Sequence, residues 1–346
     1  MRHHRFLGVL YLFAILAASA PAQPGGHPAP EKPKLLLPSE AYLSNAKQIT
    51  FEGQRSGEAY FHPDGKKICF QSVRGKCPHY QIYVKQLDGT RLVRVSPGDG
   101  LTTCSFFHPS QPLMIWASTH LDPASYRPPP MDRSKRYKWE KHASFDIFVS
   151  DHEGGNRKRL THTKGYDAEC AFSPDGTRIC FTSQRDGDLE IYTMAADGSD
   201  VRRVTNAKGY DGGPFYSPDG KQICFRGFRD PKNPRHAQIY VINADGTNER
   251  KLTDTPAANW CPFFDPTGKY LVYSRNVGDH RNFELFIVPT AGGKSVRITT
   301  DPGADVLPAF SPDGKQLMWT STRVGGKSQV FIADIDMPKA DMFAGN

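Results

Sequence analysis

The segment Phe172–Phe181 reads Phe-Ser-Pro-Asp-Gly-Thr-Arg-Ile-Cys-Phe, a tight turn followed by strand-forming residues. In the turn, Pro174 fixes φ and Gly176 tolerates a positive φ. Downstream, short apolar runs alternate with turn residues, which predicts further strands at residues 178–183, 190–194 and 201–205. One unit therefore predicts a small antiparallel sheet of four strands, counting the strand that ends at the motif.

This unit occurs six times along the chain. Its copies begin at Phe61, Phe107, Phe172, Tyr216, Phe264 and Phe310. The motif prolines are 46, 65, 44, 48 and 46 residues apart, and a repeat of roughly 40–50 residues is typical of a propeller blade. We predict an all-β fold, a six-bladed β-propeller of four-stranded blades, over residues 45–337.

The two ends of the repeat region complement each other. After the sixth motif, strands are expected at residues 316–320 and 329–333, and no convincing fourth strand follows. Residues 47–50, before the first motif, have the pattern of a single fourth strand. We predict that this N-terminal strand completes the last blade, because closing the ring protects the sheet edges.

The segments outside the repeats predict an exported protein. Arg2 and Arg5 precede an apolar run of twelve residues and the sequence Ala20-Pro21-Ala22, which is typical of a signal peptide over residues 1–22. Such a run is too short to span a bilayer. Residues 23–44 are rich in proline and are interpreted as a linker, and residues 338–346 as a tail. The expected location is periplasmic or secreted, without a membrane span.

Charge and cysteine content narrow the partners and the chemistry. The formal net charge of +8 favours acidic partners, but no nucleic-acid-binding motif is present. The seven cysteines are an odd number, which argues against a complete disulfide framework. Cys69, Cys180 and Cys224 share an Ile-Cys-Phe context in which other repeats place apolar residues. We interpret these three as core thiols.

The repeat also resembles a known family. The runs Phe172–Thr205 and Tyr216–Thr253 combine Pro-Asp-Gly, Ile-Tyr, Ala-Asp-Gly and a closing Val-Thr or Leu-Thr. They are similar to the Pro-Asp-Gly repeats of TolB-like propellers, and the resemblance covers roughly residues 45–335. It implies a periplasmic propeller that binds protein partners in the Tol–Pal envelope system. TolB proper has an α/β domain before its propeller, for which we expect no counterpart here.

Strand alternation predicts where a binding site would lie. The Pro-Asp-Gly turns share one face of the ring, here called the turn face, and the connections between blades share the opposite face, the loop face. Innermost strands begin beside the central channel on the loop face. The predicted site at this funnel mouth comprises Glu58, Tyr166, Asp167, Glu169, Tyr210, Asp211, Trp260 and Asp305.

Two interpretations of these residues stay open. A functional mouth would bind a basic or extended peptide, or a cation. Alternatively, arginines that recur eleven residues after the motif proline pair with the acids, which is the role we favour for the three aspartates. These arginines are Arg74, Arg185, Arg229 and Arg323.

The 65-residue spacing indicates an insertion of about twenty residues in the second blade. It contains Arg136, Tyr137 and Trp139. A basic loop with aromatic residues is either a second contact for an acidic protein or glycan, or a solvated loop that packs on its own blade.

Catalytic motifs are missing from the sequence. There is no Gly-x-Ser-x-Gly elbow and no His-Glu-x-x-His pair, so we expect no enzyme activity, no metal and no cofactor. The leading hypothesis is an envelope scaffold that binds a protein or peptide, linked to envelope integrity or protein transport. The alternative is a carbohydrate-binding or carbohydrate-active propeller, with Tyr166, Tyr210 and Trp260 as stacking platforms.

Overall fold

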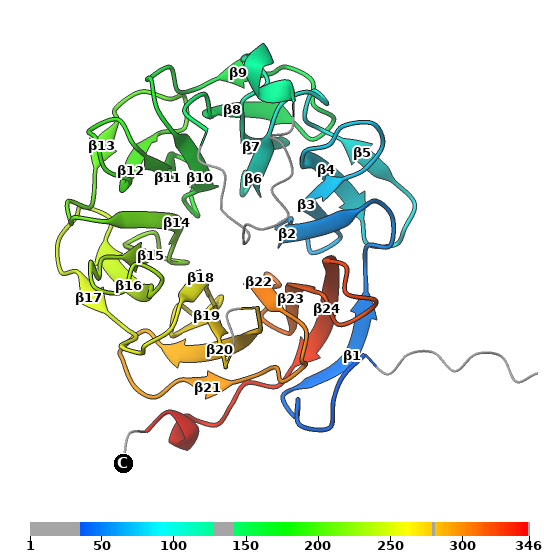
Figure 1. Cartoon of the computed structure of the whole chain (residues 1–346), viewed down its shortest axis with the longest axis vertical. Coiled ribbons are helices and arrows are strands. Elements are labelled where there is room, and N and C mark those ends of the chain that lie inside the picture. The colour runs from blue at the N-terminus through cyan, green and yellow to red at the C-terminus, as the bar shows by residue number, and fades with distance from the viewer. Residues whose placement is uncertain (1–34, 128–141, 279–280, 345–346) are drawn as a thin grey trace, which may run out of the picture. The chain divides into compact units, whose positions relative to one another are not determined.

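A computed structural model describes residues 35–127, 142–278 and 281–344. In this part of the chain, six four-stranded antiparallel sheets surround a central channel (Figure 1). The predicted six-bladed propeller is therefore confirmed. The predicted signal peptide, the linker up to residue 34 and the insertion residues Arg136, Tyr137 and Trp139 lie outside the described residues.

Each blade contributes one strand to each of four concentric positions. The innermost strands are β2 (Arg55–Phe61), β6 (Thr102–Phe107), β10 (Asp167–Phe172), β14 (Tyr210–Tyr216), β18 (Asn259–Phe264) and β22 (Asp305–Phe310). The second strands are β3 (Lys67–Val73), β7 (Leu113–Ser118), β11 (Arg178–Ser183), β15 (Gln222–Phe228), β19 (Tyr270–Asn276) and β23 (Gln316–Ser321).

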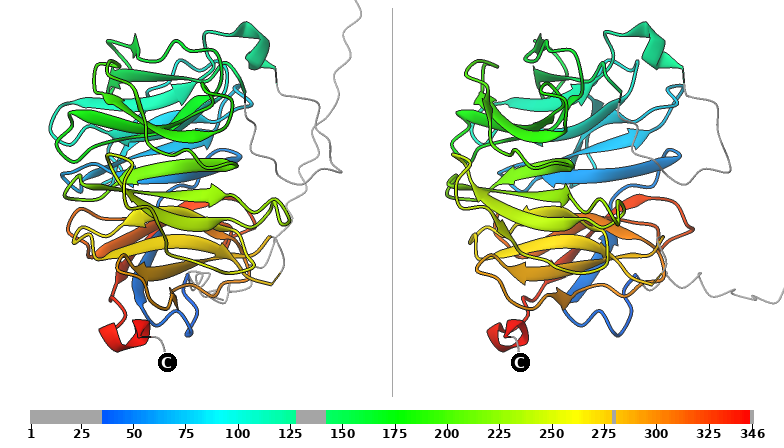
Figure 2. Two further views of the ribbon diagram at one scale, coloured as in Figure 1. Left: turned by 90° about the vertical axis from the view of Figure 1, so that its left-hand side faces the viewer. Right: turned by 60° about the vertical axis from the view of Figure 1, so that its left-hand side comes forward.

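The outer half of each blade is completed by two further strands. The third strands are β4 (Gln81–Gln86), β8 (Asp146–Asp151), β12 (Glu190–Ala195), β16 (Gln238–Asn243), β20 (Phe283–Pro289) and β24 (Gln329–Ile335). The outermost strands are β5 (Leu92–Arg94), β9 (Lys158–Arg159), β13 (Arg202–Arg203), β17 (Arg250–Lys251), β21 (Val296–Arg297) and β1 (Leu43–Gln48). Seen from the side, the strands run between the turn face and the loop face (Figure 2).

The Pro-Asp-Gly motif builds the turn that the sequence predicts. In the third blade, Gly176 adopts φ of 74° and donates its N–H to the carbonyl of Ser173 at 2.9 Å. The carboxylate of Asp175 accepts the N–H of Thr177 at 3.0 Å. A side chain that bonds to the backbone two residues on stabilises a tight turn, which explains why Asp and Gly recur together.

The ring closes through the N-terminal strand, as predicted. β1 pairs antiparallel with β24, with Leu43 opposite Ile335 and Gln48 opposite Phe331 (Figure 1). The strand begins earlier than the expected residues 47–50 and takes in the end of the expected linker. Beyond it, the Thr50 hydroxyl bonds to Gln329 at 2.6 Å.

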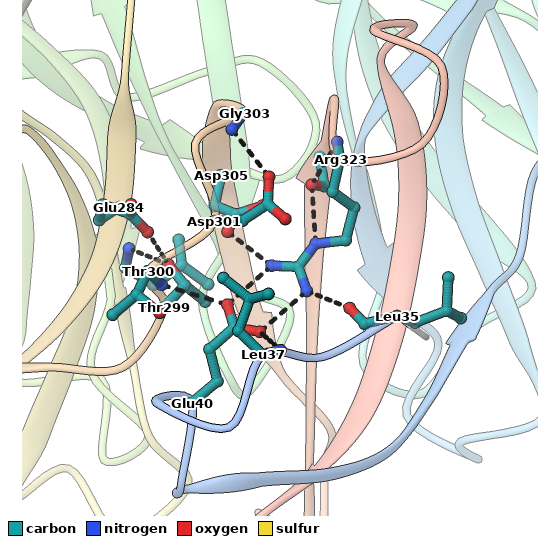
Figure 3. Close-up of polar contacts among 12 residues, drawn as sticks. Leu35, Leu37, Glu40, Glu284, Thr299, Thr300, Asp301, Gly303, Asp305 and Arg323 are labelled. Atoms are coloured by element: carbon teal, nitrogen blue, oxygen red, sulfur yellow. Dashed lines mark hydrogen bonds and ion pairs between the residues drawn. The ribbon is translucent and has the colours of Figure 1, made fainter. Parts of the chain in front are cut away.

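The described end of the expected linker packs on the sixth blade. Residues 35–42 form turns, and Glu40 is only 2% exposed. The Glu40 carboxylate contacts the Arg323 guanidinium, with an Nη2–Oε1 distance of 3.1 Å, and accepts the N–H of Thr300 (Figure 3). This ion pair explains why these residues form no extended linker: a buried carboxylate needs a nearby cation.

The core lies between neighbouring sheets. The thiols of Cys69, Cys180 and Cys224 are fully buried on second strands, which confirms their interpretation as core residues. All seven cysteines are free. In the described part of the chain, two short 3-10 helices, η1 (Pro123–Tyr126) and η2 (Ala340–Phe343), lie outside the sheets. Among the described residues, no helix combines the length and apolar character that a membrane crossing requires.

Candidate functional site

A bulge occurs at the same place in all six innermost strands. At each bulge, the residue five positions before the motif proline adopts a positive φ between 46° and 62°. These residues are Glu58, Cys104, Glu169, Gly213, Cys261 and Leu307. For a residue other than glycine such a backbone is costly, and it occurs often at functional sites. All six residues line one pocket in the central channel.

Aromatic rings pack across the channel on the turn-face side of this pocket. They belong to the residues three positions before the motif proline. The ring of Tyr60 in the first blade lies 5.3 Å from that of Phe215 in the fourth blade, measured between centroids. Phe106 and Phe263 contact both rings at 5.0–5.9 Å. Because blades one and four are opposite each other, the rings meet at the channel axis and lie across the channel on the turn-face side of the pocket.

The cavity of this pocket is small, with a volume of about 40 Å³. Its lining combines two glutamates and one arginine with thiols and apolar side chains. The further lining residues are Tyr60, Cys170, Phe215, Arg226 and Trp260. A concave and mainly apolar site with a few buried polar groups is the usual form of a ligand pocket.

Glu169 uses its full hydrogen-bonding capacity within the fold. Its carboxylate accepts hydrogen bonds from the hydroxyls of Tyr166 and Thr182, at 3.1 and 3.0 Å. The hydroxyl of Tyr210 and the N–H of Gly213 donate as well. Burial raises the pKa of Glu169, but the Arg226 charge and these hydrogen bonds outweigh it and lower the pKa below 4.5. Glu169 is therefore ionised, and contacts within the fold occupy its carboxylate.

Arg226 occupies the place that the missing side chain of Gly213 leaves. Its Nη2 lies 3.0 Å from the carboxylate of Glu169, and its guanidinium lies over the rings of Tyr210 and Trp260. A Cβ atom on Gly213 would lie 2.2 Å from Nη1 of Arg226. Gly213 is thus required both for its positive φ and for this close approach. The Nε of Arg226 is buried without a hydrogen-bond partner in the described structure.

Glu58 has the same repeat position as Glu169 but a different environment. It is 7% exposed, and its carboxylate accepts a long hydrogen bond of 3.5 Å from the Thr103 hydroxyl. Burial raises its pKa from 4.5 to about 7; a Cys104 hydrogen bond opposes this rise and the charge of Glu169 adds to it. A buried carboxyl with so little stabilisation is typical of a functional group.

The three predicted aspartates form buried ion pairs with arginines. Asp167, Asp211 and Asp305 are at most 1% exposed and pair with Arg185, Arg229 and Arg323 at 3.2, 2.5 and 2.7 Å. This confirms the pairing that the repeat positions suggest. Burial outweighs the arginine charge and raises the pKa of Asp211 and Asp305 to about 6. In the sixth blade, Arg323 lies between Asp305 and Glu40 (Figure 3).

The remaining predicted residues divide between the pocket and its support. Glu58, Glu169 and Trp260 line the pocket, whereas Tyr166 and Tyr210 hold Glu169. Arg226, Gly213, Leu307, Cys104 and Cys261 line the pocket but were not among the predicted site residues. The distance of five residues before each motif proline would have identified all of these except Arg226. Within the described residues, no group of three or more His, Cys, Asp and Glu is placed to hold a metal ion.

Comparisons with known proteins agree with this architecture. The family model of the Tricorn protease N-terminal beta propeller domain matches residues 142–284, and that of the TolB beta propeller domain matches residues 232–344. A structure assigned as TolB from Agrobacterium tumefaciens is 20% identical with a TM-score of 0.60, covering 84% of this chain and 97% of that one.

Two further solved structures share the fold. TolB from Acinetobacter baumannii is 20% identical with a TM-score of 0.55, and the match covers 81% of this chain and 64% of that one. Oligogalacturonate lyase from Vibrio parahaemolyticus is 15% identical with a TM-score of 0.54, covering 84% and 93%. The repeats and the blades make the chain a six-bladed β-propeller, and its C-terminal part is similar to the TolB beta propeller domain.

Proposed function

We propose that this propeller is a non-catalytic scaffold that binds an extended segment of a protein partner in its central pocket. The observation that carries the proposal is the convergence of side chains from all six blades on one pocket that contains polar groups without full partners. Glu58 and the Nε of Arg226 are these groups. Buried polar groups that the fold leaves unsatisfied are costly, so a ligand that satisfies them gains affinity.

The shape of the pocket favours a peptide over a sugar. Tyr166 is 1% exposed and bonds to Glu169, and the ring of Tyr210 stacks on Phe228. Of the three aromatic residues that we considered as sugar platforms, only Trp260 therefore lines the pocket. A narrow channel that ends at packed rings suits a single extended chain. The proposed setting is the periplasmic or extracellular side of the envelope, with a role in envelope integrity or protein transport.

Photo-crosslinking in the native cells tests this proposal. A photoreactive phenylalanine analogue is placed at Trp260, at the pocket, and in a control variant at Thr247, which is exposed in the turn between β16 and β17 on the turn face. We expect a protein adduct at the first position and none at the second. Adding Leu307→Trp, which fills the pocket, should abolish the adduct. Adducts only at Thr247, or at neither position, would refute the proposal.

A further inference from the structure

Glu58 and Glu169 occupy the same repeat position, but their side chains make different contacts. Glu169 receives donors from neighbouring strands and an arginine, whereas Glu58 makes no ion pair in the described part of the chain. The Thr103 hydroxyl near Glu58 lies closer to the side-chain oxygen of Gln71, at 2.9 Å. Since a hydroxyl has one hydrogen to donate, Glu58 keeps acceptor capacity for a ligand.

When Glu58 is ionised, the pocket carries one uncompensated negative charge. Ionised Glu58 and Glu169 contribute two negative charges, and Arg226 contributes one positive charge. Burial raises the pKa values of the lining thiols Cys104, Cys170 and Cys261 well above 9.0, so they are neutral. Burial likewise keeps the Tyr60 phenol neutral by raising its pKa. A singly charged cation beside Glu58 would neutralise the pocket.

The apolar lining indicates what carries this cation. Tyr60, Phe215, Trp260 and Leu307 surround the same space as Glu58. Such surfaces pack against methylene groups, and the face of an indole attracts cations. An ammonium is a compact charge with three donors, whereas a guanidinium is planar and needs a wider set of acceptors. A narrow channel with one unpaired carboxyl therefore favours an ammonium.

We propose that Glu58 binds a primary ammonium group on an apolar stem, from a lysine side chain or from the amino terminus of the partner segment. This inference rests on the proposed function, since it names the chemistry of the segment that enters the pocket. At the mouth of the pocket, the Trp260 ring would contact the apolar stem. Glu58 would accept hydrogen bonds from the ammonium group.

Titration of the full-length protein with short peptides tests this inference. The probes are blocked alanine pentapeptides with a central lysine, norleucine or arginine, and an alanine pentapeptide with a free amino terminus. The indole N–H resonance of Trp260 reports binding. We expect at least one of the two ammonium probes to bind tenfold or more tightly than the norleucine peptide. Which of them does so distinguishes a side-chain from a terminal ammonium.

Variants assign the preference to one carboxyl. Glu58→Gln should reduce the preference to less than twofold, and Glu58→Asp should retain part of it. Glu52→Gln, which removes an exposed acid between β1 and β2, should leave it unchanged. Equal binding of norleucine or arginine, a preference that persists in Glu58→Gln, or no binding of any probe would overturn the inference. Crosslinking at Trp260 would then still stand, so failure of this inference is distinct from failure of the proposed function.

The affinity for the ammonium probe should also depend on pH. For the central-lysine peptide, binding needs ionised Glu58, whose pKa is about 7, so the affinity should rise about tenfold from pH 6 to pH 8. A terminal amine, with an ordinary pKa of about 8, loses part of its own charge in this range and should show a smaller rise. The other groups facing Glu58 keep one charge state in this range: Glu169 ionised, Arg226 protonated, and Tyr60, Cys104 and Cys261 neutral. A flat affinity between these pH values would contradict the assignment.

Discussion

Replacing Glu58 by Gln should stabilise the protein at alkaline pH. Glutamine keeps the size of the side chain and removes the charge that is buried beside Glu169. The pKa of Glu58 in the folded protein is about 7, against an ordinary value of 4.5. The folded state therefore holds a proton that the unfolded chain releases between these two pH values.

The sign and size follow from this difference. The folded state binds more protons than the unfolded state between pH 4.5 and 7, so the Glu58 contribution to stability falls as pH rises through this window and stays low above it. One pH unit corresponds to about 1.4 kcal/mol, so the full loss is on the order of 3 kcal/mol. Glu58→Gln should show no such loss and gain about 3 kcal/mol over wild type at pH 8, relative to pH 4.5.

Urea unfolding of both proteins at intervals from pH 4.5 to 8 measures this difference, because other carboxyls titrate alike in the two proteins. Glu169→Gln is the matched control at the same repeat position. It leaves Arg226 buried without its carboxylate and should destabilise the protein by roughly 3–5 kcal/mol at pH 7. Wild-type and Glu58→Gln stabilities that stay parallel across the pH range would refute the reasoning.

Three further outcomes follow from the packing. Gly213→Ala should destabilise the protein by roughly 1–3 kcal/mol, because its Cβ would lie 2.2 Å from Nη1 of Arg226 at a positive φ; thermal unfolding measures this, and an unchanged midpoint would contradict it. Glu40→Gln should weaken the contact with Arg323 and expose residues 35–42 to proteases while the blades stay intact. Limited proteolysis measures this, and equal cleavage rates of the variant and the wild type would count against it. A thiol reagent should modify the half-buried Cys77 first, since the other six cysteines are buried; mass spectrometry showing several rapidly labelled sites would contradict that burial.

The sequence predicts the fold because the same turn-and-strand motif occurs in every blade. Asp and Arg at fixed distances from the motif proline predict the Asp211–Arg229 pair without coordinates. Glu58 and Glu169 cannot be told apart by such distances, since both lie five residues before a motif proline. What separates them is Arg226, which belongs to the second strand of the next blade and reaches Glu169 only because Gly213 has no side chain.

Contacts between distant residues limit prediction in the same way. Glu40 lies in a proline-rich segment that resembles a linker, and its partner Arg323 follows 283 residues later. Nothing local to residues 35–42 indicates that they pack on the sixth blade. The aromatic rings across the channel are likewise visible as repeat positions, but their contact at the axis depends on the closure of the ring.

The difference between the two glutamates can be measured directly. Carbon-13 NMR of the side-chain carboxyls, assigned through Glu58→Gln and Glu169→Gln, gives the pKa of each residue in the folded protein. We expect Glu58 to titrate near pH 7 and Glu169 to titrate below 4.5. Titration of both near 4.5, or the reverse order, would show that the pocket does not hold an unpaired carboxyl.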